Sequence, residues 1–269
     1  MKKIGMIGCG NMGEAILSAI LSNSIVSNRQ VLVSDIDSAK LDRIKGAYKV
    51  DVTFNNSIVA KSSECLILAV KPQEMDEALA SVMEYLGEKK LLISVAAGVT
   101  IKRISSIVGK NIRIARVMPN MPALVRMGFS AIAFSSNMDA KKADFAKKIF
   151  RSVGDVEEVE EKALDAVTAV SGSGPAYFYY LIETLISAGI KLGLKPDTAR
   201  KAVIKTALGS VELLNRTKGS PGDLRRKVTS KGGTTEAALG VFKKMGLARI
   251  IEDGVKAARA RSRELSGDR

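Results

Sequence analysis

The pattern of hydrophobic and polar positions divides the chain into two parts. Up to about residue 160, short apolar runs alternate with segments that place apolar residues at helical spacing. The apolar runs are nearly continuous, as expected for strands covered on both faces, and their alternation with helices is typical of a doubly wound parallel sheet. The predicted strands are residues 3–7, 30–34, 65–70, 91–95, 112–117 and 130–134.

Helix boundaries can also be predicted from the sequence. Pro72 opens a predicted helix that continues to about residue 86, Thr100 opens a shorter one, and Asp139 is the expected N-cap of a helix that stops at Gly154. Beyond residue 160 the strand pattern disappears. The predicted helices there are residues 163–170, 175–192, 196–214 and 235–263.

No linker rich in Pro, Gly or Ser separates the two parts, so we expect a tight junction near Glu161. The sequence therefore predicts an α/β domain over residues 1–161 and an all-helical domain over residues 162–269. With 46% hydrophobic and 26% charged residues, the whole chain is expected to fold.

The composition also limits the compartment. No apolar window reaches about 18 residues, so we expect a soluble protein with no membrane partner. The two cysteines, Cys9 and Cys65, have neither metal-ligand spacing nor a disulfide framework around them. They indicate a reducing compartment, and we expect a cytoplasmic protein without a bound metal.

Charge and the absence of histidine restrict the function. The formal net charge of +14 suits an anionic partner, but the basic residues are dispersed, aromatic residues are only 4%, and no nucleic-acid motif is recognisable. We therefore expect no nucleic-acid partner. Because the chain has no histidine, Ser-His-Asp hydrolysis and dehydrogenation with a His base are excluded unless another residue substitutes.

The segment Gly8-Cys9-Gly10-Asn11-Met12-Gly13 is a G-x-G-x-x-G that follows the first predicted strand and opens a helix. In this Rossmann-type context, Gly8 and Gly10 permit a tight turn and a close approach of the backbone to a pyrophosphate, and Gly13 permits helix–strand packing. The free N–H groups at the start of the helix favour an anion. We expect Gly8, Gly10, Asn11, Met12 and Gly13 to bind a dinucleotide.

The end of the second predicted strand leaves the choice of nicotinamide cofactor open. Asp35 is placed to accept from a ribose 2′-OH, which favours NAD, or to cap the following helix. Ser34 and Lys40 can instead hold the 2′-phosphate of NADP. NADPH is the expected cofactor and NADH is possible.

At this point the sequence resembles pyrroline-5-carboxylate reductases. The resemblance spans nearly the whole chain and is carried by Ala69-Val70-Lys71-Pro72, Ala96-Ala97-Gly98, Met118-Pro119-Asn120, Val170-Ser171-Gly172-Ser173-Gly174-Pro175-Ala176-Tyr177 and Val228-Thr229-Ser230-Lys231-Gly232-Gly233-Thr234-Thr235. It implies an NAD(P)H-dependent reduction of 1-pyrroline-5-carboxylate to L-proline. It also implies a break in the helix at 170–177 and a helical domain that builds a homodimer or a larger homo-oligomer.

The resemblance assigns further residues to the cofactor. Glu161 would lie near the nicotinamide end. Asn56 is also supported by its place after the third-strand region, although with Asn55 it can be a plain turn pair. The residues that would line the cofactor are Gly8–Gly13, Ser34, Asn56, Ala69, Val70, Lys71, Pro72 and Ala97, and we add Asp35 for its position.

The loop over residues 230–235 has its own physical interpretation as an anion cradle, because two glycines expose backbone N–H groups before a helix begins. The alternative is a structural turn capped by Thr234 or Thr235. The resemblance makes the anion the substrate carboxylate, with Thr235 near the ring nitrogen and Ser230 beside the carboxylate; these two are the candidate catalytic residues. The candidate substrate-binding residues are Lys227, Ser230, Gly232, Gly233, Thr234 and Thr235.

Some positions depart from the family pattern. The family usually has Pro at the position of Lys231, often Asn or Gln at that of Lys227, and commonly Thr at that of Met121. A paralogue that reduces another imine or keto acid therefore remains an alternative, as does a nucleotide-sensing protein without activity. A hydroxy-acid dehydrogenase is disfavoured, because no Lys follows Gly174 before Lys191.

Overall fold

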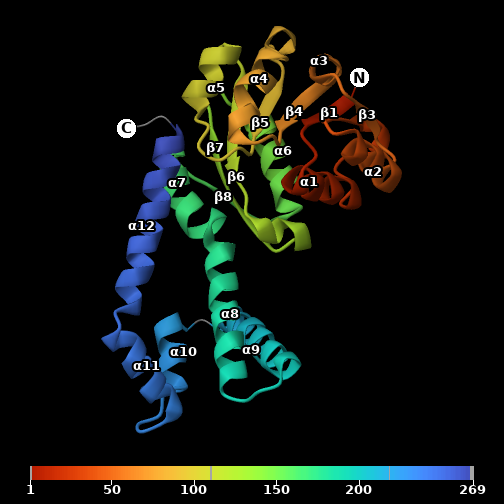
Figure 1. The fold of residues 1–269 in the computed structure, drawn as a ribbon. Coiled ribbons are helices and arrows are strands. Elements are labelled where there is room, and N and C mark those ends of the chain that lie inside the picture. The colour runs from red at the N-terminus through yellow and green to blue at the C-terminus, as the bar shows by residue number, and fades with distance from the viewer. Residues whose placement is uncertain (1, 110, 218, 267–269) are drawn as a thin grey trace. The chain divides into compact units, whose positions relative to one another are not determined.

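The computed structural model describes residues 2–109, 111–217 and 219–266, drawn in Figure 1. The chain forms two compact units. The first, the sheet unit, contains the described residues of Met1–Ser173 and Ala258–Arg269, and the second, the helical unit, is Gly174–Ala257. The division predicted at residues 161 and 162 follows the change in secondary structure, and it stays a prediction.

The sheet unit is built on one eight-stranded sheet with the order β3-β2-β1-β4-β5-β6-β7-β8. Its strands are β1 (Lys2–Ile7), β2 (Val31–Ser34), β3 (Asp51–Thr53), β4 (Ser63–Leu68), β5 (Leu91–Ser94), β6 (Arg113–Met118), β7 (Gly128–Phe134) and β8 (Gly154–Glu158). All neighbours pair in parallel except β6 and β7. The predicted doubly wound sheet is thus confirmed as mostly parallel. β7 reverses because the connection from β6 is too short for a crossover helix.

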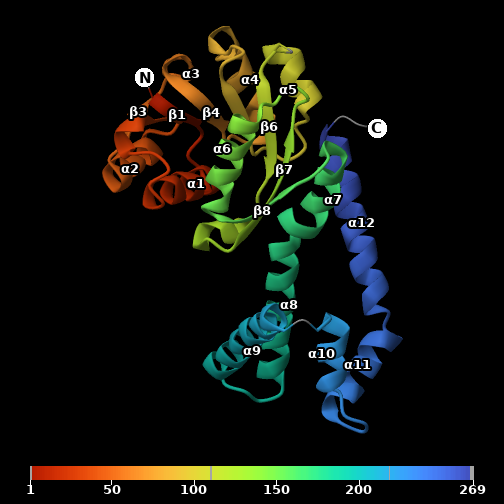
Figure 2. The same ribbon diagram turned by 180° about the vertical axis from the view of Figure 1, so that it is seen from behind.

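Helices cover both faces of the sheet (Figures 1 and 2). The helices of this part are α1 (Asn11–Ser22), α2 (Ser38–Tyr48), α3 (Asn56–Ser62), α4 (Met75–Ala80), α5 (Ile101–Val108) and α6 (Ala140–Arg151). Helices α1, α2 and α6 share one buried cluster with Ile4 and Met6 of β1, whereas α3, α4 and α5 share the other with Ile7. The alternation of side chains along a strand therefore supplies both cores.

The predicted caps at Thr100 and Asp139 are confirmed, since their side chains accept from the backbone N–H groups of Arg103 and Lys142. The predicted stop at Gly154 is wrong: α6 ends at Arg151, and Gly154 begins β8. Its φ of +148° and the overlap that a Cβ would have with the backbone of the paired Gly128 require glycine there. The helix opened by Pro72 ends at Ala80, before the predicted residue 86.

Near residues 170–177, where a helix break is predicted, a π-turn interrupts the α-helix. Helix α7 (Leu164–Val167) continues through a π-turn, Thr168–Gly172, into α8 (Gly174–Lys191). The N–H of Ser173 donates to the carbonyl of Thr168 at 2.8 Å, which closes the wide turn. A Cβ on Gly172 would overlap the end of the Met118 side chain, so the π-turn lies closely against the end of β6.

The end of the last helix, α12 (Leu247–Ser266), belongs to the sheet unit. Ser262 Oγ donates to Asp165 Oδ1 of α7 at 2.7 Å, and both residues are buried. A Cβ on Gly98 would come within 2.8 Å of Leu265 Cβ, so α12 packs directly against the backbone that follows β5. The hydroxyl of Ser262 supplies a hydrogen bond that a buried carboxylate requires.

The helical unit confirms that the C-terminal part is all-helical. It contains α8, α9 (Pro196–Arg216), α10 (Pro221–Lys227), α11 (Thr234–Lys244) and the start of α12. The single helix predicted over 235–263 is wrong, because Gly246, with φ +71°, separates α11 from α12. Helix α10 was not predicted; Ser220 and Asp223 form its capping box. Within the described residues, no helix is long and apolar enough to cross a membrane.

The contact between Ser262 and Asp165 gives a stability prediction. Ser262→Ala leaves the buried Asp165 carboxylate without its donor, and we expect the free energy of unfolding to fall by about 1–3 kcal/mol. Urea unfolding followed by circular dichroism measures this change. Adding Asp165→Leu removes the unpaired charge and is expected to recover part of the loss. A Ser262→Ala protein as stable as the wild type would contradict the assigned role.

Candidate functional site

The first candidate site lies where the parallel strands end. Gly8, directly after β1, has φ +90°, and its N–H donates to the carbonyl of Ser34 at the end of β2 at 2.8 Å. On the other side, the N–H of Ala69 donates to the carbonyl of Ile7 at 2.8 Å, and a Cβ on Gly8 would come within 2.6 Å of Ala69 O. The glycine loop is therefore held between the carboxyl ends of β2 and β4, at the switch point of the sheet.

The loop leads into the N-terminus of α1. Gly10 is the N-cap residue, and no described atom beyond its chain neighbours lies within 4 Å of a Cβ placed there. A Cβ on Gly13 would instead overlap the carbonyl oxygen of Gly8. The first N–H groups of α1, on Asn11 and Met12, have no intrahelical acceptor. The predicted glycine residues thus form an open backbone surface that suits an anion.

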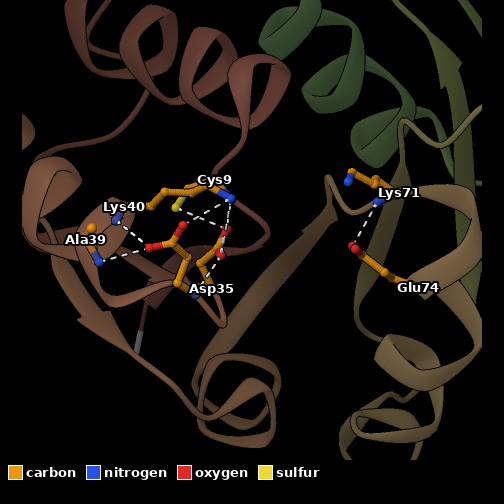
Figure 3. A network of polar contacts seen from close by, with 7 residues as sticks. Cys9, Asp35, Ala39, Lys40, Lys71 and Glu74 are labelled. Atoms are coloured by element: carbon orange, nitrogen blue, oxygen red, sulfur yellow. Dashed lines mark hydrogen bonds and ion pairs between the residues drawn. The ribbon is translucent and has the colours of Figure 1, made fainter.

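Asp35 lies beneath this loop (Figure 3). Its Oδ2 accepts from the N–H of Cys9 at 2.8 Å and from Cys9 Sγ at 3.3 Å, and its Oδ1 accepts from the N–H of Asp37 at 3.0 Å. The alternative role of Asp35 as a helix cap is wrong. Asp37 is the N-cap of α2 and accepts from the N–H groups of Ala39 and Lys40.

The surroundings shift the pKa of both groups in the contact between Asp35 and Cys9. Burial by itself would raise the pKa of Asp35, but the hydrogen bonds from Cys9 and Asp37, together with the charge of Lys40, lower it below its usual value. Burial, and then the hydrogen bond and charge of Asp35, raise the pKa of the Cys9 thiol to about 12. Asp35 is thus ionised and Cys9 is a protonated, unreactive thiol near neutral pH.

The structure brings Ser34 and Asn56 together. Ser34 Oγ donates to Asn56 Oδ1 at 2.7 Å, and Asn56 Nδ2 donates to Ser81 Oγ at 3.2 Å. Asn55 caps α3, accepting from the N–H groups of Ser57 and Ile58. The alternative of a plain turn pair is therefore wrong, because Asn56 connects the ends of β2 and α4.

The remaining predicted cofactor residues follow β4 and β5. Ala69 and Val70 are half-buried, Lys71 is exposed, and Pro72 begins a 3₁₀ turn, Pro72–Glu74. The N–H of Lys71 donates to Glu74 Oε2 at 3.2 Å (Figure 3). Ala97 is half-buried after β5. All of them lie at the same edge of the sheet as the glycine loop, because parallel strands end on one side.

A pocket of about 290 Å³ opens at this edge, next to the glycine loop. It is lined by Asn11, Met12, Val95, Met118, Pro119, Asn120, Met121, Leu124 and Gly172. The side chain of Asn120 is held in place, because its Oδ1 accepts from the N–H of Phe129 at 2.9 Å and its Nδ2 donates to Ser171 Oγ at 3.1 Å. Most of these residues were missed as site residues, although the segment Met118-Pro119-Asn120 is one of the motifs that carry the family resemblance.

Glu161, which is half-buried, forms an ion pair with a buried arginine in the sheet unit. Its Oε1 accepts from Arg116 Nη1 at 3.0 Å and from the N–H of Ile101 at 2.7 Å. Arg116 is only 4% exposed, so the pair fixes the start of α5 to β6. The predicted place of Glu161 near the nicotinamide end stays a prediction.

The second candidate site is the loop between α10 and α11 in the helical unit. Gly233 is the N-cap of α11 and no side chain caps this helix, so the alternative cap at Thr234 or Thr235 is wrong. The N–H of Gly233 donates to the carbonyl of Ser230 at 3.1 Å, and Gly232 has φ +72°. The first-turn N–H groups of α11 are therefore not used by side-chain caps, as an anion cradle requires.

Charged residues flank this loop. Lys227, the last residue of α10, is exposed, as is Lys231 at the tip. Glu236, which was not predicted, accepts from the N–H of Gly232 at 2.7 Å and holds the loop against α11. Its position three residues after the N-cap is the signal in the sequence that indicates this contact. Among the residues that the structure describes, no group of acidic or cysteine side chains could hold a metal ion.

Both parts of the chain match known protein families. Residues 161–265 match the family model "Pyrroline-5-carboxylate reductase dimerisation", and residues 3–98 match "NADP oxidoreductase coenzyme F420-dependent". The chain is 41% identical over 263 residues to the pyrroline-5-carboxylate reductase of Synechocystis, covering 98% of both chains.

Two solved structures are similar over the same length. A pyrroline-5-carboxylate reductase from Coxiella burnetii has 35% identity and a TM-score of 0.91, covering 98% of each chain. The pyrroline carboxylate reductase of Plasmodium falciparum, crystallised with NADP bound, has 30% identity and a TM-score of 0.90, also covering 98% of each chain.

The different surroundings of Gly13 and Gly10 give a second prediction. Gly13→Ala forces α1 away from Gly8 and is expected to cost about 1–3 kcal/mol of stability. In Gly10→Ala the added methyl group enters open space, so the melting temperature of this variant should stay within about 2 °C of that of the wild type. Both variants should bind a nicotinamide dinucleotide more weakly, since each changes the anion-binding surface. Thermal unfolding and nucleotide fluorescence measure the two effects; equal stabilities would contradict the packing role of Gly13.

Proposed function

The chain belongs to the pyrroline-5-carboxylate reductase family, and on that premise we propose that it transfers a hydride from NADPH, or from NADH, to the C=N bond of 1-pyrroline-5-carboxylate and so forms L-proline. The observation that carries this function is the glycine loop at the switch point of the sheet, with its open N–H groups next to a pocket of about 290 Å³. Such a site suits a dinucleotide with its reactive ring in the pocket.

The residues of the sheet unit fit this cofactor. Gly8 leaves no room for a Cβ, while the space over Gly10 is open to a ligand, as close approach of a pyrophosphate requires. When bound, the nicotinamide nucleotide supplies the hydride. The residues proposed to hold it are Gly8, Gly10, Asn11, Met12, Gly13, Ser34, Asn56, Ala69, Val70, Lys71, Pro72 and Ala97, with Glu161 near the nicotinamide end.

We assign the substrate to the loop of the helical unit. The hydroxyls of Ser230 and Thr234 and the first-turn N–H groups of α11 are suited to a carboxylate, whereas the N–H groups of Gly232 and Gly233 already donate to Glu236 and Ser230. Thr235, in the first turn of α11, is the residue proposed to orient the ring nitrogen. Lys227 and Lys231 are exposed and add positive charge that attracts an anionic substrate.

The chemistry is consistent with a chain that lacks histidine. Reduction of a cyclic imine adds a hydride to the carbon of the C=N bond and leaves the electron pair on nitrogen, which carries the proton of the iminium. Because the substrate brings this proton, the protein does not need a strong general acid. Its contribution is to hold the two reactants in a near-attack geometry, with the Thr235 hydroxyl accepting from the iminium N–H.

The protein forms homo-oligomers through its dimerisation region, and we propose a homodimer or a larger assembly of dimers. Helix α8 supports this, because large apolar side chains on it are exposed, including Phe178, Tyr180 and Leu181. We also propose a cytoplasmic location, which agrees with the two buried free cysteines, Cys9 and Cys65.

The first test follows nicotinamide absorbance with 1-pyrroline-5-carboxylate as acceptor and compares NADPH with NADH. We expect rapid oxidation that depends on the imine. Oxidation only with another imine or a keto acid would favour a paralogue whose substrate is selected by Lys227 and Lys231. Binding of a nucleotide without oxidation of any acceptor would indicate a nucleotide-sensing protein instead.

Thr235 provides the sharper test of mechanism. Thr235→Val keeps the shape of the side chain but removes the hydroxyl, and we expect kcat/KM for the imine to fall by about 10- to 100-fold, as for loss of a hydrogen bond to a charged group. The matched control is Thr229→Val in the same loop, whose hydroxyl donates to the carbonyl of Arg225 at 2.6 Å. Equal activity of the two variants would remove Thr235 from the mechanism.

A further inference from the structure

We propose that Asp35 is a positioning residue for the glycine loop and does not bind the ribose 2′-OH of the cofactor. This inference rests on the proposed binding of a nicotinamide dinucleotide and concerns how that site is built. Asp35 stands at the position from which an acidic side chain selects NAD in Rossmann-type folds. The contacts of the Asp35 carboxylate indicate instead that it holds the glycine loop in place.

Both oxygens of the Asp35 carboxylate are already bound to backbone N–H groups. Oδ2 accepts from the N–H of Cys9, in the middle of the glycine loop, at 2.8 Å (Figure 3). Oδ1 accepts from the N–H of Asp37 at 3.0 Å. The side chain of Asp35 is only 8% exposed. A ribose 2′-OH would therefore have to compete with two charge-assisted hydrogen bonds inside the protein.

The contact has a clear structural purpose. Cys9 is buried, so its N–H requires an acceptor inside the protein. The neighbouring N–H, on Gly8, is bound to the carbonyl of Ser34 at 2.8 Å. Consecutive amides of the loop are thus fixed to consecutive residues at the end of β2, and this places Gly10 and the start of α1 where a pyrophosphate can reach them.

The charges around Asp35 agree with this role. Lys40 Nζ lies 3.9 Å from Asp35 Oδ1 and 3.7 Å from Asp37 Oδ2, so one cation faces both carboxylates. The Asp35 carboxylate accepts from two N–H groups and faces a cation, so its negative charge repels a 2′-phosphate only weakly. Loss of Asp35 should therefore weaken NADPH and NADH alike.

The test compares Asp35→Asn with Asp37→Asn. Asparagine at 35 keeps one oxygen and must release one of the two N–H groups, whereas asparagine at 37 removes the same charge and remains a good N-cap. Binding of NADPH and of NADH to the full-length protein is measured by nucleotide fluorescence without substrate. For Asp35→Asn we expect the Kd of NADPH and the Kd of NADH each to rise about tenfold. The ratio of these two Kd values should stay within about twofold of the same ratio in Asp37→Asn. In steady state, the KM for the nucleotide should rise by a similar factor with kcat little changed.

The ratio of the Kd of NADPH to the Kd of NADH distinguishes a positioning role of Asp35 from a contact with the ribose. If Asp35 binds the ribose 2′-OH, Asp35→Asn should weaken the binding of NADH and leave the binding of NADPH unchanged or tighter. A ratio of the two Kd values that differs about tenfold from that of the Asp37→Asn control would therefore overturn the proposal. Failure to reduce 1-pyrroline-5-carboxylate would affect the proposed function alone, since these binding measurements contain no imine.

Thiol labelling tests the same contact without any cofactor. The Cys9 thiol donates to Asp35 and is otherwise buried, so a loosened loop should expose it. We expect iodoacetamide to label Cys9 at least tenfold faster in Asp35→Asn than in the wild type and in Asp37→Asn, as measured by peptide mass spectrometry. Bound NADPH should slow this labelling. Equal labelling rates in the wild type and Asp35→Asn would overturn the proposal.

Discussion

The close approach of backbone to backbone at the end of β1 is the constraint on which the cofactor site depends. Parallel strands end at one edge of a sheet, and there the chain leaving β1 must pass between the chains leaving β2 and β4. Gly8 can do so because it has no Cβ and accepts a φ of +90°. Gly13, in the first turn of α1, likewise has no room for a Cβ, because one would overlap the carbonyl oxygen of Gly8. Any side chain at these positions would separate α1 from the strands, and its N-terminus would no longer point at the ligand.

Buried charged and polar groups fix the elements around this loop. Asp35 joins β2 to the glycine loop, Glu161 and Arg116 join the start of α5 to β6, and Asp165 with Ser262 joins α7 to α12. A buried charge is costly unless it is paired, so each contact defines one relative position of its two elements. Apolar packing alone tolerates small shifts. These contacts therefore explain how a sheet unit whose described residues form three separate hydrophobic clusters holds the pocket next to the loop.

The strands of the sheet that are buried on both faces could be predicted from the sequence, but the ends of the sheet could not. Strands β3 and β8 were missed because they are short and polar, and largely exposed at the two edges. The π-turn before Gly172 has the same residue types as an α-helix, so no pattern of apolar positions reveals it. The break at Gly246 was hidden because the apolar residues on both sides continue a helical spacing.

The candidate site could be predicted most directly where its residues are adjacent in the sequence. The glycine loop and the 230–235 loop have fixed local spacing, whereas Val95, Leu124 and Gly172 line the pocket from three distant segments of the chain. Residue type alone leaves three roles open for Asp35, since an acidic residue after β2 can bind a ribose, a helix end or a loop, and only the geometry of its contacts separates these roles. For the proposed substrate loop, residue type leads further. Its hydroxyl and backbone N–H groups do not titrate near neutral pH, so in the proposed reaction the protonation state that matters is that of the imine itself. A site built in this way can dispense with histidine, because its proposed task is to orient a substrate that already carries its proton.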